Sequence, residues 1–227
     1  YGTEGTIIGF NEDSTDVLLV KEKDPLKTGD QAVMTLEPFN TPVGKGFVGR
    51  VVNVLGEAID DLGPLAYDTY YPIFPDSPSV LQREVVKETV ETGIKVLDTM
   101  IPIGRGQRQL ILGDKMTGKT TIGTDIILNQ KGKDVICIYC SIGKGKAALD
   151  RVVNLFKSKD AFQYTIIVAA MAGASPGQQY LSPYVACSLG EYFMHKGGHV
   201  VVVFDDFTKH AWAYREISLL LGRLPGR

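Results

Sequence analysis

The pattern of hydrophobic and polar positions divides the chain into parts of different character. Up to residue 66 the apolar residues come in short runs, TIIGF, DVLLV, QAVMTL and FVGRVVNVL, which predict β-strands. The segments between these runs, NEDSTD, DPLKTGD and EPFNTPVGKG, are rich in the Gly, Pro, Asn and Asp residues of turns. Since no helical period of useful length occurs there, we predict a small all-β domain, a barrel or sandwich, over residues 1–66.

Beyond Thr92 the pattern becomes an alternation of strands and helices. Continuous apolar runs predict strands that are buried on both faces of a parallel sheet. The second predicted helix lies between two such runs, and its apolar residues recur at i, i+3, i+4 and i+7, namely Leu149, Val152, Val153 and Phe156. The predicted strands are 109–112, 134–142, 164–170 and 199–206, and the predicted helices are 119–130, 147–159, 182–196 and 209–222. Such an alternation predicts an α/β domain over residues 93–227.

Residues 67–92 have neither pattern. The stretch YPIFPDSPS carries three prolines, which restrict the backbone and cannot donate hydrogen bonds to a sheet. We interpret 67–92 as an ordered linker between an N-terminal β-barrel domain and the α/β domain.

Composition and charge exclude several classes of protein. The 24 basic and 26 acidic residues give a net charge of −2, so no broadly basic surface for nucleic acid is expected. No apolar run is long enough to cross a bilayer. Cys137 and Cys140 form a C-x-x-C pair, but on a strand they point to opposite faces and cannot share a metal. The chain starts at Tyr1 and ends on LPGR, which indicates a piece of a longer protein.

The stretch GDKMTGKTT follows the first predicted strand of the α/β domain and opens its first helix. It fits the pattern G-x-x-x-x-G-K-[ST], in which backbone N–H groups surround phosphate oxygens and the lysine reaches the terminal phosphates. Thr121 is placed to donate to the α-phosphate. The candidate residues for binding ATP or ADP are therefore Gly113, Asp114, Lys115, Met116, Thr117, Gly118, Lys119, Thr120 and Thr121.

A magnesium ion is expected beside such a loop. The Thr120 hydroxyl is one candidate ligand, and Asp205, directly after the apolar run VVVVF, supplies the carboxylate at the end of a neighbouring strand. Asp206 points the other way on an extended strand. We therefore predict a P-loop site that holds a nucleotide with Mg²⁺ through Thr120 and Asp205.

Several longer motifs carry a family resemblance. TGIKVLD, PIGRGQRQLILGD, TGKT, GRVVNVLGEAIDDLGP and VFDDFTKHAWAYREISLLLGRLPGR together resemble the α subunit of the F-type ATP synthase, collinearly over nearly the whole chain. The resemblance implies a RecA-like fold for the α/β domain and a non-catalytic Mg-ATP site. The family's arginine that reaches the neighbouring catalytic site, and its adenine-closing residues, would lie beyond Arg227.

The resemblance also implies partners and a location. An α-type chain would alternate with catalytic β-type subunits in a hexameric ring, around a central shaft and held by stator subunits. It would contribute to ATP synthesis coupled to a proton gradient. It would contact no nucleic acid and would meet the membrane only through the membrane sector. It would lie peripherally on the cytoplasmic face of a bacterial plasma membrane, or on the equivalent face of an organelle inner membrane.

The stretch SIGKGK bears on whether the site hydrolyses ATP. By the resemblance, Lys144 stands where catalytic β subunits place a glutamate that activates water, and where α subunits usually carry glutamine. A lysine ammonium cannot accept the proton of the water, so we predict binding without efficient turnover and assign no catalytic residue. Lys144 as a solvated loop charge remains open. Glu191 is another possible catalytic carboxylate, for which we favour a structural role. Met116 stands where the family commonly has a glutamine.

Three other functions stay open. If the chain were a catalytic ATPase of a rotary, secretion or other hexameric machine, a carboxylate would be expected at position 144. An α-like paralogue in a related rotary machine would account for Lys144 and Met116. A hexameric RNA translocase predicts a basic, aromatic-rich barrel. Residues 1–66 instead carry many acids, among them Glu4, Glu12, Asp13, Asp16 and Asp24.

Overall fold

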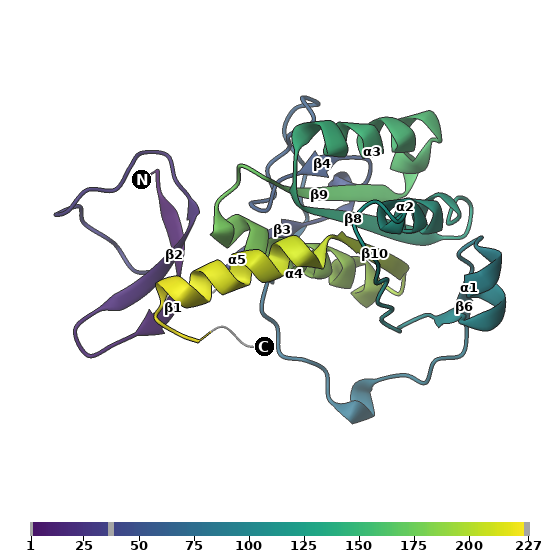
Figure 1. Ribbon diagram of the computed structural model, residues 1–227, viewed down its shortest axis with the longest axis horizontal. Helices are drawn as coiled ribbons and strands as arrows, with labels where there is room; N and C mark the ends of the chain where they lie inside the picture. The colour runs from purple at the N-terminus through teal and green to yellow at the C-terminus, as the bar shows by residue number, and fades with distance from the viewer. Residues whose placement is uncertain (1, 36–38, 225–227) are drawn as a thin grey trace.

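The computed structural model describes residues 2–35 and 39–224 (Figure 1). The strands are β1 (Glu4–Phe10), β2 (Thr15–Lys21), β3 (Asn40–Val43), β4 (Val51–Val52), β5 (Thr69–Pro72), β6 (Thr89–Val90), β7 (Ile103–Gly104), β8 (Val135–Lys144), β9 (Thr165–Met171) and β10 (His199–Asp205). The α-helices are α1 (Lys95–Met100), α2 (Lys119–Leu128), α3 (Lys146–Ser158), α4 (Pro176–His195) and α5 (Phe207–Leu220). None of these helices combines the length and the apolar character that crossing a membrane requires.

A four-stranded parallel sheet forms the centre of the molecule. Its strand order is β10-β8-β9-β4, and each neighbouring pair is parallel. The continuous apolar runs of β8 and β9 are buried along almost their whole length, as expected for strands that are covered on both faces. This confirms the predicted α/β architecture.

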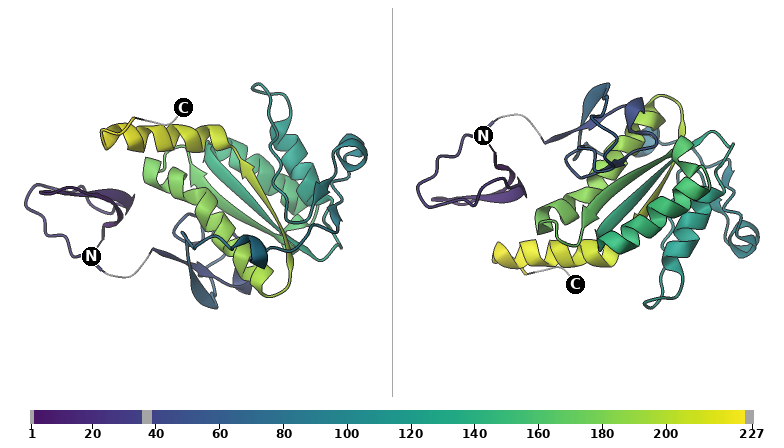
Figure 2. Two further views of the ribbon diagram at one scale, coloured as in Figure 1. Left: turned by 90° about the horizontal axis from the view of Figure 1, so that it is seen from below. Right: turned by 90° about the horizontal axis from the view of Figure 1, so that it is seen from above.

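Helices cover both faces of the sheet (Figures 1 and 2). On one face, Cys140 and its neighbours pack against the apolar side of α4, and α5 lies beside α4. On the other face, Cys137 packs with residues of α2 and α3. The two cysteines thus belong to two separate cores, which confirms that they face opposite sides of the strand.

Helices α2 to α5 confirm the four helical predictions, with shifted ends, whereas α1 was not predicted. In α3 the predicted apolar face is correct, because Leu149, Val152 and Phe156 are buried. Helix α4 starts at Pro176, six residues before the predicted start. The side chain of Ser175 accepts a hydrogen bond from the N–H of Gln178 at 3.2 Å, and proline suits the first helical position.

The structure does not confirm the predicted barrel. Strands β1 and β2 form an antiparallel hairpin, whereas β3 pairs with β5 from the segment interpreted as a linker. Strand β4 instead joins the parallel sheet beside β9. Residues 31–35 of the run QAVMTL form no strand. Short apolar runs indicate strands without specifying partners, and the buried β4 pairs with an edge of the central sheet. The division into 1–66, 67–92 and 93–227 stays a prediction.

The predicted strand 109–112 is wrong. These residues have no regular secondary structure, and the side chains of Leu110 and Leu112 are exposed. Within the described part of the chain, β10 pairs with β8 on one edge and has no strand on its other edge. An apolar run favours burial, but a strand forms only where another strand pairs with it.

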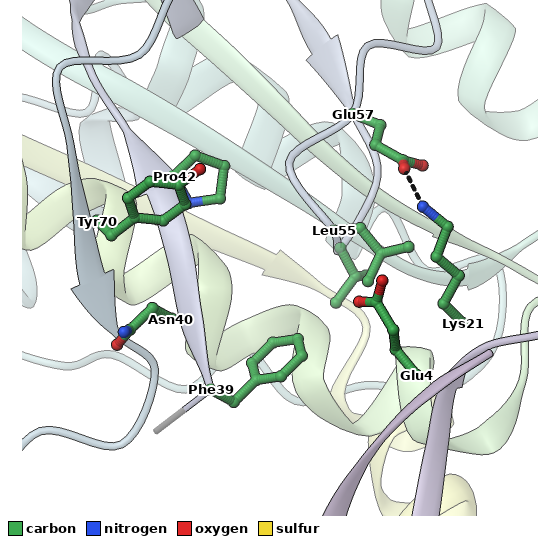
Figure 3. Close-up of a pocket in the computed structure, with 9 residues that line it drawn as sticks. Glu4, Lys21, Phe39, Asn40, Pro42, Leu55, Glu57 and Tyr70 are labelled. Carbon is green, nitrogen blue, oxygen red and sulfur yellow. Dashed lines mark hydrogen bonds and ion pairs between the residues drawn. The ribbon is translucent and has the colours of Figure 1, made fainter. Parts of the chain in front are cut away.

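The hairpin lies against the body over a shallow pocket (Figure 3). Glu4 and Lys21 reach this pocket from the hairpin, and Lys21 pairs with Glu57 at 2.6 Å. Both partners are well exposed, so this ion pair contributes little to stability. None of the predicted site residues lines the pocket, which is lined by Glu4, Lys21, Phe39, Asn40, Pro42, Val54, Leu55, Glu57 and Tyr70.

A better-buried ion pair fixes the start of β4. Arg50 donates from Nε and Nη2 to the two carboxylate oxygens of Asp60 at 2.7 and 2.8 Å. The same carboxylate accepts the backbone N–H of Val51 at 3.0 Å. Hydrogen bonding from Arg50 lowers the pKa of Asp60 from 3.8 to about 2, although partial burial opposes that shift.

This shift predicts a pH-dependent contribution to stability. A carboxyl group with a lowered pKa in the folded state stabilises the fold at pH values above its unfolded pKa of 3.8, and the effect disappears as the pH falls through about 2. We expect Asp60→Asn to lower the free energy of unfolding at pH 7 by about 2 kcal/mol, since one pKa unit corresponds to about 1.4 kcal/mol. Urea denaturation at several pH values measures this difference.

The matched control is Glu57→Gln, which breaks the exposed pair with Lys21 and should cost less than about 1 kcal/mol. Equal losses for the two variants, or a loss for Asp60→Asn that does not shrink in acid, would contradict the assignment.

Candidate functional site

The loop 113–118 links the irregular segment before it to helix α2. Gly118 caps the helix with a φ of +92°, a left-handed conformation that glycine adopts without strain. Met116 also lies in the left-handed region, with a φ of +66°, and its side chain is 95% exposed. The hydroxyl of Thr117 donates to the carbonyl of Asp114 at 2.8 Å. The backbone therefore makes the tight turn that the glycine pattern predicted.

The lysine of the motif lies over this turn. Lys119 Nζ donates to the carbonyl oxygen of Gly113 at 2.7 Å and also to that of Asp114. Lys115 and Thr121 are exposed. The ammonium of Lys119 thus sits where the loop closes on itself, beside the N-terminal end of α2, which favours anions.

The structure brings the two predicted metal ligands together across 85 positions of sequence. Thr120 lies in the first turn of α2, and its hydroxyl donates to Asp205 Oδ2 at 2.8 Å. Asp205 is the last residue of β10, whereas Asp206 caps α5 by accepting the backbone N–H of Lys209 at 3.0 Å. As predicted, Asp205 therefore faces the site and Asp206 does not.

Two further side chains reach the same carboxylate from β8, the strand next to β10. The phenol of Tyr139 donates to Asp205 Oδ2 at 2.5 Å, and the ammonium of Lys144 forms an ion pair with that oxygen. Lys144 Nζ also donates to the hydroxyl oxygen of Thr120 at 3.1 Å. Tyr139 is a residue of the site that no sequence motif indicated. Its only signal was a tyrosine within a buried strand, where the hydroxyl needs a partner.

Lys144 is not a solvated loop charge, so that alternative is wrong. It ends β8, and its side chain is 17% exposed beside an Asp205 side chain that is 9% exposed. Burial is the main cause that raises the pKa of Tyr139, and the negative charge of Asp205 raises it further. The phenol therefore keeps its proton and remains a donor, while Lys144 supplies the balancing charge.

The fit of a magnesium ion can be judged from these contacts. A hydroxyl and a carboxylate are suitable ligands for Mg²⁺. However, both oxygens that the sequence assigns to the metal, Thr120 Oγ1 and Asp205 Oδ2, are contacted by the ammonium of Lys144. As arranged here, the side chains do not leave Asp205 free for a metal ion.

A glycine-rich loop at a helix start, beside a carboxylate at the end of a parallel strand, is typical of nucleotide-binding α/β proteins. Consistent with this class, residues 93–227 match the nucleotide-binding domain of the ATP synthase alpha/beta family. The chain belongs to the ATP synthase alpha/beta family.

Relatives specify the resemblance further. The chain is 47% identical over 226 residues to ATP synthase subunit alpha of Caldanaerobacter subterraneus subsp. tengcongensis, covering 100% of the chain and 45% of that protein. It is 46% identical over 226 residues to subunit alpha of Nitrosomonas europaea, covering 100% and 44%. It is 48% identical over 223 residues to subunit alpha of Clostridium botulinum, covering 98% and 44%. These matches confirm the predicted similarity to ATP synthase alpha subunits. The chain spans less than half the length of these relatives.

The hydrogen bond from Tyr139 predicts a measurable contribution to stability. We expect Tyr139→Phe to lower the free energy of unfolding by about 1.5–3 kcal/mol, the range for hydrogen bonds to charged groups. The matched control is Tyr164→Phe, which removes a longer bond of 3.3 Å to the carbonyl of Leu128. Urea unfolding of both variants tests this difference, and a loss no larger for Tyr139→Phe than for Tyr164→Phe would contradict it.

Proposed function

We propose that the chain is part of a non-catalytic, regulatory α-type subunit that binds ATP or ADP in a proton-translocating F-type ATP synthase. Such a subunit contributes to ATP synthesis coupled to a transmembrane proton gradient. Membership of the family and the names of the relatives support this proposal. The ion pair of Lys144 with Asp205 beside the loop is the main support for the absence of catalysis in this proposal.

The nucleotide would lie on the loop Gly113–Thr121. Phosphate oxygens would accept hydrogen bonds from backbone N–H groups of the turn and from the first turn of α2. Lys119 would exchange its two carbonyl partners for the negatively charged phosphates, which are stronger acceptors. The hydroxyl of Thr121, which is exposed, would donate to the α-phosphate.

Efficient hydrolysis would need a base beside the terminal phosphate. Lys144 stands at the end of β8, where its ammonium is held by the carboxylate of Asp205 and the hydroxyl of Thr120. A protonated amine has no lone pair to accept the proton of a water molecule. The carboxylate at this site is itself occupied by three donors. The site therefore favours binding over turnover, which argues against a catalytic hexameric ATPase.

Assembly and location follow from the same proposal. The subunit would alternate with catalytic β-type subunits in a hexameric ring and would contact central shaft and stator subunits. It would bind no nucleic acid and would meet the membrane only through the membrane sector, on the cytoplasmic face of a bacterial plasma membrane or its organelle equivalent. If Mg²⁺ accompanies the nucleotide, its ligands from the protein would be Thr120 and Asp205, once Lys144 withdraws.

Nucleotide binding by the full-length subunit tests the role of the loop. We expect Lys119→Gln to weaken ATP binding at least about tenfold, because hydrogen bonds to charged groups contribute about 1.5–3 kcal/mol. The control is Lys157→Gln, which removes an exposed lysine of helix α3 outside the loop and should leave the affinity unchanged. Equilibrium titration with a fluorescent ATP analogue measures both. Equal affinities for wild type and Lys119→Gln would refute the assigned loop.

Phosphate release tests the absence of turnover. The full-length subunit should bind ATP and release negligible phosphate by itself, whereas the complex with a β-type partner should release phosphate at sites of that partner. Release is followed with a phosphate-binding reporter under saturating ATP. Brisk release by the isolated subunit would favour the catalytic alternative instead.

A further inference from the structure

We infer that the ammonium of Lys144 takes the place of the divalent cation at this site, so that the subunit binds nucleotide with little dependence on Mg²⁺. Lys144 and a metal ion would then exclude one another from Asp205. This inference rests on the proposed nucleotide-binding function and concerns which cation accompanies the nucleotide.

The contacts of Lys144 are those that a metal ion would make. Its ammonium contacts Thr120 Oγ1 at 3.1 Å and pairs with Asp205 Oδ2. These are the same two oxygens that the loop pattern assigns to Mg²⁺. A positive charge is therefore already built into the position between helix α2 and the end of β10.

Burial explains why this carboxylate requires a resident cation. The side chain of Asp205 is 9% exposed, and a buried carboxylate is costly unless it is paired. Thr120 and Tyr139 donate hydrogen bonds but carry no charge. Lys119 is directed to the carbonyls of Gly113 and Asp114 instead. Among the described contacts, the positive charge on Asp205 comes from Lys144.

The backbone of β8 aims Lys144 at this position. In a regular strand, residues five apart such as Tyr139 and Lys144 point to opposite faces, yet both contact Asp205. The pairing of β8 with β9 shifts register between Ile142 and Lys144, and Gly143 there has a φ of +62°. Such a bulge re-aims the next side chain. The orientation of Lys144 is thus a property of the strand and its glycine.

Gly143 is also enclosed by side chains. A Cβ at this position would lie 2.8 Å from Gln179 Oε1 and 2.9 Å from Lys209 Cβ. Together with the left-handed φ, this spacing leaves glycine as the residue that fits without displacement. Beyond the bulge, the carbonyl of Lys144 accepts the N–H of Ala172 at 3.0 Å. This bond and the enclosed glycine fix the backbone from which the side chain of Lys144 extends.

The test measures nucleotide affinity in the full-length subunit with excess MgCl₂ and, separately, with excess EDTA. Wild type should bind ATP almost equally well under the two conditions. Lys144→Gln should lose at least about tenfold in EDTA and regain affinity with MgCl₂, because Asp205 becomes available to the metal. The matched control is Lys146→Gln, which removes an exposed lysine two residues away and should behave like wild type.

Thermal unfolding without nucleotide provides an independent readout. Wild type and Lys146→Gln should melt at the same temperature with and without MgCl₂. Lys144→Gln should melt at a lower temperature in EDTA, because it leaves a buried charge unpaired, and MgCl₂ should raise that temperature by binding the folded state.

The outcomes separate the two proposals. If wild type requires MgCl₂ for ATP binding as strongly as Lys144→Gln does, the inference about Lys144 is overturned while the nucleotide-binding function stands. If neither wild type nor Lys146→Gln binds ATP under either condition, the proposed function itself fails. Should Lys144→Gln not fold, the comparison of wild type in MgCl₂ and in EDTA still decides the matter.

Discussion

The carboxylate of Asp205 is the point at which the elements of the site meet. Helix α2 contributes Thr120, strand β8 contributes Tyr139 and Lys144, and β10 carries the carboxylate itself. A nearly buried carboxylate is costly in free energy when a hydrogen-bond donor or a cation beside it is missing, so its neighbours must be placed accurately. The relative positions of the helix and the two strands are therefore tied to this one group.

The sheet supplies the rigidity that such a cluster needs. Strands β8 and β10 are paired in parallel over seven residues of β10, and separate apolar cores pack on the two faces of the sheet. Because both strands end at the same edge, residues at their carboxyl ends lie close together. The glycine-rich loop before α2 is different in character, since its residues 113–117 are exposed. A buried ion pair thus lies next to an exposed loop at this edge of the sheet.

The family relation and the particular side chains have separate implications. The match to the nucleotide-binding domain and the alpha-subunit relatives account for the loop, the parallel sheet and the aspartate at the strand end. The cation on that aspartate, Lys144, is a separate observation from the structure. Because Lys144 pairs with Asp205, the site holds a neutral ion pair rather than an open carboxylate.

The sequence by itself determined the loop, its helix, the strands β8, β9 and β10, and the proximity of Thr120 to Asp205. Those features depend on local patterns: a glycine spacing, apolar runs and an acid at a strand end. The tertiary structure alone decided that β4 joins the sheet, that 109–112 forms no strand, and that Lys144 turns onto Asp205. These outcomes depend on which strand edge is available and on a register shift at Gly143, and both are set by contacts between residues distant in sequence.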